Sequence, residues 1–209
     1  MAKVRAAIIF LNGTPVAAER LKPYLRSKPL LIGCDGGTRQ LIALGLTPDA
    51  IIGDFDSWPD DDLEGVTAVR YPVDKDHTDG ELAIQYARMA GCQEIILVGA
   101  LGGRLDHLLG HLLLLNKREF RALSLKIIDD TQEAFLIRKT AQVQGKKGDI
   151  VSFMPLNGPV KVVSCRGLRY PLSNYRLSPQ ANMGISNVMT AQSAEIVLSH
   201  GTLLVIHQL

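Results

Sequence analysis

The stretch EIILVGALGGRLDHLLGHLLLLNK, residues 94–117, passes from an apolar run through a glycine-rich turn into a segment of helical length. Glu94–Val98 is short, continuous and apolar, as expected for a strand buried on both faces of a parallel sheet. Leu105–Lys117 has the length and the apolar spacing of a helix. Strand, turn and helix in this order form the repeating unit of an open α/β sheet.

The same alternation occupies the chain up to residue 138. Short apolar runs of strand length are separated by segments with helical spacing. We expect further strands at Val4–Leu11, Leu30–Cys34, Ala50–Ile52 and Leu123–Ile128, and further helices at Thr38–Leu44 and Thr78–Ala90. Residues 1–138 are therefore predicted to form an α/β domain with a mostly parallel, Rossmann-like sheet.

The pattern changes around Arg138–Gly148, where Lys and Gln replace the apolar runs. Beyond it, helical spacing disappears and short runs are separated by Gly, Pro, Asn and Ser, which is typical of a small antiparallel sandwich or barrel. Residues 139–209 are therefore predicted to form an all-β domain. Its strands are expected at Asp149–Met154, Val160–Ser164, Ala194–Leu198 and Thr202–His207.

Charge also divides the chain. Residues 1–135 carry 15 Lys and Arg against 19 Asp and Glu, a net charge of −4, whereas residues 136–209 carry 8 against 2, a net charge of +6. The basic residues of the second half are scattered among few aromatic residues, so nucleic acid is not an expected partner. The two parts of the chain therefore differ electrostatically.

Composition favours an intracellular globular protein. The chain has 209 residues, of which 46% are hydrophobic, enough to form real cores. No apolar run approaches the roughly 18 residues of a membrane span, and the beginning reads as a strand and turn instead of a signal sequence. Three cysteines without a CxxC pair predict buried, reduced thiols. We expect a cytoplasmic location and no membrane partner.

Glycine and aspartate follow nearly every predicted strand. In an open α/β sheet, ligands bind beyond the carboxyl ends of the strands, so these residues are the first candidates for a site. They lie in the segments Asp35-Gly36-Gly37, Gly53-Asp54-Phe55-Asp56-Ser57, Asp74-Lys75-Asp76-His77-Thr78-Asp79 and Gly99-Ala100-Leu101-Gly102-Gly103-Arg104-Leu105-Asp106-His107.

Asp54 and Asp56 are candidate metal ligands. In an extended chain both carboxylates point to the same side while Phe55 points to the other. Mg²⁺ suits paired carboxylates because it takes oxygen ligands and completes its shell with water and substrate phosphates. The alternative is a solvated turn, which is how we interpret Asp60–Asp62. The other acidic strand exits favour the metal, and Asp76 and Asp79 are expected to complete the site.

Two predicted helix starts are candidate phosphate sites. Thr78 and Glu81 fit a capping box, and a helix N-terminus also binds phosphate, to which Lys75 adds a positive charge. Gly102 and Gly103 allow the backbone to approach a phosphate closely, and Arg104 can bind it with two donors. The sequence contains neither GxxxxGK[ST] nor GxGxxG, which excludes the P-loop and the dinucleotide fingerprint.

Two other arrangements receive a plain interpretation. His107 and His111 are four residues apart, and we interpret them as surface or core histidines of a helix instead of metal ligands. Ser57 and Ser152 have no matched histidine and acid, so a hydrolytic triad is not indicated.

The four segments above occur together with Pro48-Asp49, Gly167-Leu168-Arg169-Tyr170 and Gly184-Ile185-Ser186-Asn187. In this order and spacing, over nearly the whole chain, they resemble the thiamine pyrophosphokinase (thiamine diphosphokinase) family. The resemblance implies transfer of the diphosphoryl group of ATP to the hydroxyl of thiamine, giving thiamine diphosphate and AMP, with Mg²⁺. It also implies a catalytic α/β domain, a β-sandwich that helps to bind thiamine, and a homodimer with active sites between subunits.

The resemblance also implies roles for individual residues. Those at metal-binding positions are Asp54, Asp56 and Asp79. Those around the nucleotide and the reacting groups are Asp35, Lys75, Thr78, Arg104 and Asp106, beside the glycines Gly36, Gly102 and Gly103. Those on the thiamine side are Tyr170, Ser186 and Asn187. Either Asp76 or Asp106 is expected to accept the proton of the attacking hydroxyl.

Two rival functions stay open at this point. One is a pyrophosphokinase for another heterocyclic alcohol, such as a hydroxymethylpterin. The other is a nucleotide-binding regulator without turnover. The regulator is less favoured because carboxylates around a polyanion weaken binding unless a metal is present.

Overall fold

The computed structural model describes residues 5–53, 66–70 and 77–209. By its contacts the chain separates into two compact units, Met1–Asp130 and Thr131–Leu209. The predicted division after residue 138 remains a prediction. Within the described residues, no helix is long and apolar enough to cross a membrane.

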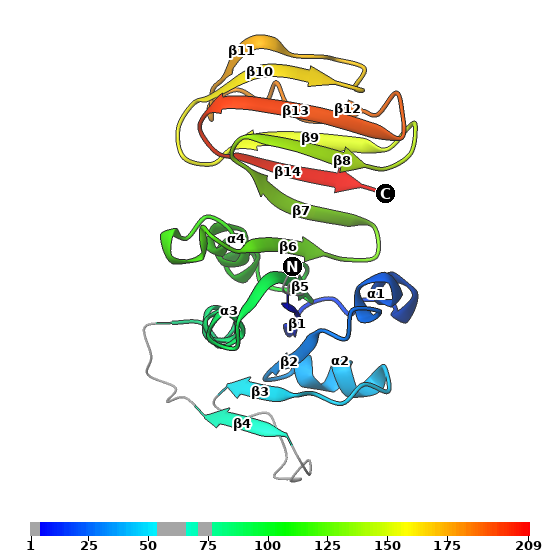
Figure 1. The fold of residues 1–209 in the computed structure, drawn as a ribbon, viewed down its shortest axis with the longest axis vertical. Coiled ribbons are helices and arrows are strands. Elements are labelled where there is room, and N and C mark those ends of the chain that lie inside the picture. Colours follow the sequence, from blue (N-terminus) through cyan, green and yellow to red (C-terminus); the bar gives the residue numbers. More distant parts are fainter. Residues whose placement is uncertain (1–4, 54–65, 71–76) are drawn as a thin grey trace. The chain divides into compact units, whose positions relative to one another are not determined.

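The first unit is an α/β domain, as predicted (Figure 1). Its strands pair in the order β6-β5-β1-β2-β3-β4, and every pair between these neighbours is parallel. From β1 the chain winds outward to β4 and then returns to β5 on the other side of β1. The strands are β1 (Arg5–Phe10), β2 (Leu30–Cys34), β3 (Ala50–Gly53), β4 (Thr67–Arg70), β5 (Cys92–Val98) and β6 (Ser124–Ile128).

Helices cover both faces of this sheet, with α1 and α2 on one side and α3 and α4 on the other (Figure 1). On the first face, Leu21 of α1 and Leu41 of α2 pack in one buried cluster with Ile8 and Phe10 of β1. Because side chains alternate along a strand, Ile8 and Phe10 share a face. The helical elements are α1 (Ala18–Leu25), α2 (Gly37–Ala43), α3 (Asp79–Met89), α4 (Leu105–Leu114) and the short 3₁₀ helix η1 (Arg118–Phe120).

The second unit is an antiparallel β-sandwich. One layer contains the strands β12-β9-β14-β7, which are part of the ten-stranded sheet, and the other is a four-stranded sheet of order β11-β10-β13-β8. The strand pairs within both layers are antiparallel. Val151, Phe153 and Val205 of the first sheet share a buried cluster with Val162 and Ile196 of the second. The strands are β7 (Gln132–Ile137), β8 (Thr140–Gln144), β9 (Ile150–Pro155), β10 (Val160–Arg166), β11 (Ser173–Leu177), β12 (Asn187–Val188), β13 (Ser193–His200) and β14 (Leu203–Gln208).

A buried histidine lies at one end of this sandwich. His207 is 0% exposed, and its Nε2 is 3.0 Å from Oδ2 of Asp149. Its Nδ1 is 3.7 Å from Oε1 of Glu133, the residue opposite His207 on β7. The Glu133 carboxylate first, and then Asp149, raise the pKa of His207 against the opposing effect of burial. The charged form of His207 is therefore favoured in the folded unit.

The fold largely follows the sequence-based expectations. The division into an α/β part and an antiparallel sandwich is confirmed, and the sandwich replaces the barrel alternative. Cys34, Cys92 and Cys165 are buried thiols, as expected, and burial raises the pKa of Cys165 to about 11. The sequence analysis missed α1, which contains Pro23, and the edge strand β4. In the second unit it did not name β7, β8, β11 or β12. The expectation of a mostly parallel sheet is not confirmed, because the ten-stranded sheet to which these six strands belong is mixed. The Rossmann-like description remains a prediction.

Candidate functional site

A cleft of about 430 Å³ opens beyond the carboxyl ends of β1, β2 and β5. It lies where the winding of the first sheet reverses between β1 and β5, which is where ligands bind in open α/β sheets. The first turns of α3 and α4 also line it. Among the residues predicted from the sequence, it brings together Asp35, Thr78, Asp79, Gly102, Gly103 and Arg104.

The floor of the cleft is made by two loops packed backbone to backbone. Leu11 N–H donates to Val98 O at 2.8 Å, and Thr14 N–H donates to Leu101 O at 2.8 Å. A Cβ atom on Gly13 would lie only 2.3 Å from Gly99 O. The two loops can approach this closely because a side chain is missing at the point of contact.

Asp35 occupies the exit of β2 with a left-handed backbone, φ 42°. Its N–H donates to Ile52 O at 3.2 Å, and a Cβ atom on Gly53 would lie 1.6 Å from its Oδ1. The ends of β2 and β3 therefore meet at this carboxylate. Gly36 is not among the residues that line the cleft. It packs against Asn12, which does line it, because a Cβ atom on Gly36 would lie 2.4 Å from Oδ1 of Asn12.

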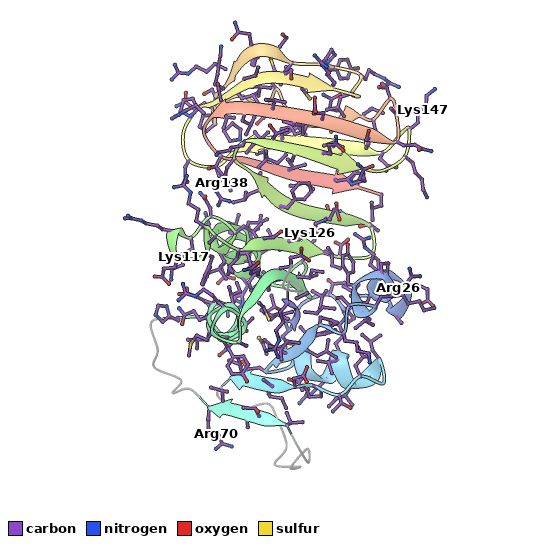
Figure 2. All side chains as sticks on the ribbon, in the orientation of Figure 1. Arg26, Arg70, Lys117, Lys126, Arg138 and Lys147 are labelled. Carbon is purple, nitrogen blue, oxygen red and sulfur yellow. The ribbon has the colours of Figure 1, made fainter. Side chains whose placement is uncertain are left out.

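Thr78 caps α3 as predicted, since its Oγ1 accepts a hydrogen bond from Glu81 N–H at 3.3 Å. The other half of the expected capping box is wrong. The Glu81 carboxylate does not reach back to residue 78. It lies 2.7 Å from Nδ1 of His77 and accepts a hydrogen bond from Lys117. Lys117 follows the end of α4 (Figure 2). The Lys117 ammonium group is a stronger partner for the buried Glu81 carboxylate than a backbone N–H. Asp79, in the first turn of α3, lines the cleft.

Arg104 and Asp106 form a two-bond pair at the start of α4. Arg104 Nε is 3.1 Å from Oδ1 of Asp106, and its second terminal nitrogen is 2.5 Å from Oδ2. The hydrogen bonds from Arg104 lower the pKa of Asp106, and the same contact raises the pKa of Arg104. Both side chains are exposed, but Arg104 lines the cleft and Asp106 is not among the lining residues. The lowered pKa makes Asp106 a poor proton acceptor.

His111 and His107 line the cleft, although the sequence analysis gave them no role. His111 Nδ1 is 3.1 Å from Ala100 O, and because a carbonyl only accepts, Nδ1 carries the hydrogen. Burial lowers the pKa of His111, which favours the neutral ring. The spacing of Arg104, His107 and His111 along a helix was the signal that could have placed all three on one face.

Four predicted residues lie outside the described residues, namely Asp54, Asp56, Lys75 and Asp76. Within the part of the chain that the structure describes, no group of three or more His, Cys, Asp or Glu side chains is arranged to hold a metal. Asp35 and Asp79 are the carboxylates that the described part contributes to the cleft.

The predicted thiamine-side residues lie together in the second unit. Tyr170 is 61% exposed, whereas Asn187 on β12 is 6% exposed. Asn187 hydrogen-bonds both polar backbone groups of Tyr170. Ser186 has a left-handed backbone, φ 60°, and its N–H donates to Oγ of Ser152 at 3.0 Å. Ser152 Oγ thus holds the backbone of Ser186.

Comparison with known proteins decides the family. Residues 21–127 match the model of the thiamin pyrophosphokinase catalytic domain, and residues 136–203 match that of the thiamin pyrophosphokinase vitamin B1 binding domain. The chain belongs to the thiamin pyrophosphokinase family. Within this family it is 28% identical over 194 residues to thiamine pyrophosphokinase of Bacillus subtilis strain 168, covering 89% of this chain and 90% of the relative. It is 27% identical to thiamine pyrophosphokinase 1 of Oryza sativa subsp. japonica, covering 91% and 82%.

Solved structures of thiamin pyrophosphokinases have the same fold over their whole length. The crystal structure of the Bacillus subtilis protein superposes with a TM-score of 0.87 at 25% identity, covering 98% of this chain and 99% of that one. The Geobacillus thermodenitrificans structure gives 0.82 at 26% identity, with coverage of 99% and 98%. Both units of this chain are therefore shared with the family.

Proposed function

We propose that the cleft of the first unit is where this chain performs the reaction of its family. In that reaction the diphosphoryl group of ATP is transferred to the hydroxyl of thiamine, which gives thiamine diphosphate and AMP. The observation that carries the proposal is the convergence of two helix N-termini, those of α3 and α4, on one cleft lined by glycine backbone and Arg104. Backbone N–H groups and the positive ends of both helices suit a polyphosphate.

Arg104 is the cation of the described residues best placed for the phosphates. It is exposed, lines the cleft and is oriented by Asp106. Transfer of a phosphoryl-type group depends mainly on positioning and on neutralising charge, so an oriented guanidinium suits it. The attacking oxygen bonds to the β-phosphorus, the bond from that phosphorus to the α-phosphate oxygen breaks, and AMP leaves. The hydroxyl proton goes to a carboxylate, for which Asp76 and Asp106 are the candidates.

Mg²⁺ fits the carboxylates at this edge of the sheet. Asp79 and Asp35 line the cleft, and β3 ends at Gly53, against Asp35 and directly before Asp54 and Asp56 in the sequence. Mg²⁺ binds through one or two carboxylates together with substrate phosphates, which this donor set supplies. Asp54, Asp56 and Asp79 would hold the ion, whose charge stabilises the negative phosphate oxygens. Asp35 would orient the nucleotide-side groups.

The second unit supplies the thiamine side in this proposal. Thiamine carries a positive thiazolium ring, and an exposed aromatic face such as that of Tyr170 attracts a cation. Asn187 binds the Tyr170 backbone, and Ser186 precedes Asn187 in the sequence. The net charge of +6 on residues 136–209 means that shape and the aromatic face, not net charge, hold the thiazolium there.

A homodimer with active sites between subunits is also part of the proposal. Its support is the apolar stripe of α4, formed by Leu105, Leu109 and Leu113, which are 69%, 51% and 62% exposed. These residues recur every four positions, so they share one helix face. A large apolar stripe on a surface indicates an interaction site, and a second copy is the commonest partner. The cytoplasmic location remains a prediction.

The decisive experiment is product analysis. Purified protein is given ATP, Mg²⁺ and either thiamine or a hydroxymethylpterin, and AMP and ADP are separated by chromatography. We expect AMP and thiamine diphosphate in equal amounts with thiamine alone. ADP formation would contradict transfer of an intact diphosphoryl group. AMP formation with the pterin alone would show that the alcohol substrate is the pterin and not thiamine. ATP binding without turnover with either alcohol would make the chain a regulator.

A further inference from the structure

The Asn187 side chain is turned into the protein. It is 6% exposed, although it belongs to the motif that the family resemblance places at the thiamine side. An asparagine that hydrogen-bonds a substrate must have amide atoms that are not already used within the protein. The hydrogen bonds of the Asn187 amide therefore decide its role.

The Asn187 oxygen is fully used within the second unit. Its Oδ1 accepts hydrogen bonds from Tyr170 N–H at 3.0 Å and from Val188 N–H at 2.9 Å. An amide oxygen has two lone pairs, so both are occupied. Its Nδ2 donates to Tyr170 O at 2.8 Å. The amide thus binds both backbone groups of Tyr170, as a neighbouring strand would.

This contact continues a short antiparallel connection between the two motifs. Leu168 and Met189 form an isolated bridge, and Arg169 N–H donates to Val188 O at 2.8 Å. Tyr170 lies beyond β10 and before β11, so no strand of its own fixes its backbone. Beyond Arg169, where the backbone hydrogen bonds of this connection stop, the Asn187 amide makes the next two hydrogen bonds, both with the backbone of Tyr170.

We infer that Asn187 is a positioning residue that acts through Tyr170, holding the backbone of Tyr170 while the exposed Tyr170 ring contacts the substrate. The inference rests on the proposed function for the role of the ring, and on the hydrogen bonds of Asn187 alone for the contact itself. Holding the ring in place before binding lowers the entropy lost on binding. Asn187 is therefore needed for affinity without touching thiamine.

A double-mutant cycle tests this directly. Asn187→Ala, Tyr170→Ala and the double variant are compared for the KM of thiamine and the KM of MgATP. We expect each single variant to raise the thiamine KM about tenfold with little change for MgATP, and the double variant to match Tyr170→Ala alone. Residues that act through one another are non-additive in this way. A double variant whose KM rises by the product of both single effects would show that Asn187 contacts thiamine itself.

Two additions keep the test decisive. Asn187→Asp keeps the shape and Oδ1 but loses the donor to Tyr170 O, so it covers the case in which Asn187→Ala does not fold; the same non-additivity is expected. Amide hydrogen exchange of Tyr170, measured by NMR, needs no turnover. Its protection should fall at least about tenfold in Asn187→Ala and stay unchanged in Asn157→Ala, an exposed asparagine of the same unit. Unchanged protection in Asn187→Ala would overturn the inference, whatever the substrate is.

Discussion

Gly53 and Asp35 meet so closely that a Cβ atom on Gly53 would lie 1.6 Å from Oδ1 of Asp35. The contact joins the ends of β2 and β3 at the edge of the cleft. Only the end of a side chain stands in the way, so Asp35 can rotate aside when a methyl group is added. The displacement moves a carboxylate that the proposed function uses.

Gly53→Ala should therefore lower activity more than stability. We expect kcat/KM for MgATP to fall about 10²-fold, because misplacement by about 1 Å can have that effect. The midpoint of thermal unfolding should fall by only a few degrees. Gly110→Ala is the matched control for stability, since nothing lies within 4 Å of a Cβ there and alanine favours a helix. A Gly53→Ala enzyme with normal kinetics would remove Asp35 from the site.

Asp54→Asn and Asp56→Asn should each abolish turnover, by at least about 10²-fold, because a metal-held phosphate loses its main charge partner. The circular dichroism spectra of both variants should remain unchanged, because the fold stays intact.

Asp79→Ala should lower kcat and raise the KM of MgATP more than it raises the KM of thiamine. Calorimetry of ATP binding with and without Mg²⁺ measures the metal directly. Asp61→Asn, in the segment interpreted as an acidic loop, is the control, and near-normal turnover in both Asp54→Asn and Asp56→Asn would refute the metal assignment.

His111→Ala should reduce kcat about tenfold by releasing the Ala100 carbonyl and loosening the loop that reaches Arg104. His111→Asn should recover most of the activity, because its amide nitrogen can donate to the same carbonyl. Steady-state kinetics of both variants decides this. Equal losses in the two variants would mean that the second ring nitrogen, not the contact with Ala100, is what the site needs.

His207→Gln should destabilise the second unit most at low pH. The raised pKa of His207 means that the protonated ring adds stability in full below its unfolded pKa of about 6.5, and that this contribution is lost as pH rises through the higher folded pKa. Removing it should lower the free energy of unfolding by about 1–3 kcal/mol at pH 6, because two carboxylates lose a buried partner. The difference in the free energy of unfolding between His207→Gln and the wild-type protein should become smaller toward pH 9.

Urea unfolding at both pH values measures this effect. His200→Gln, at an exposed histidine of β13, is the control and should show no such trend. A His207→Gln difference that grows with pH would mean that the buried ring is neutral.

Leu109→Glu should convert the protein to monomers in analytical ultracentrifugation, since it places a charge in the middle of the α4 stripe. Val163→Glu alters an exposed apolar residue of β10 and should leave the oligomer intact. A wild-type chain that sediments as a monomer at all concentrations would remove the homodimer from the proposal.

Sequence reasoning could bring together the residues of the first unit because of one geometric rule. Parallel strands end at the same edge, so Asp35 after β2 and Gly102 after β5 had to approach each other. The sequence analysis did not place His111 in the site, because the position of this residue depends on which face of α4 turns inward. The ring then lies beside α3, since a Cβ atom on Gly80 would be 3.6 Å from Nε2 of His111, an ordinary contact distance.

The Glu81 contact and the inward orientation of the Asn187 side chain could not be predicted from the sequence for a different reason. Lys117 meets Glu81 across a separation of 36 residues, and a capping motif describes only neighbours in sequence. Asn187 points inward because β12 pairs with β9 in a particular register, Asn187 opposite Val151. A shift of one residue would turn the side chain outward, and sequence alone does not set that register.

The Asn187 amide holds residue 170 by its backbone N–H and C=O only. Every residue type except proline offers these two groups, so the side chain at position 170 is free to vary while the loop keeps its shape. An aromatic ring there can be exchanged for another group without rebuilding the sandwich around it. This separation of scaffold from recognition surface makes position 170 a natural place for a thiamin pyrophosphokinase to acquire a new alcohol substrate during evolution, or for a designer to select one.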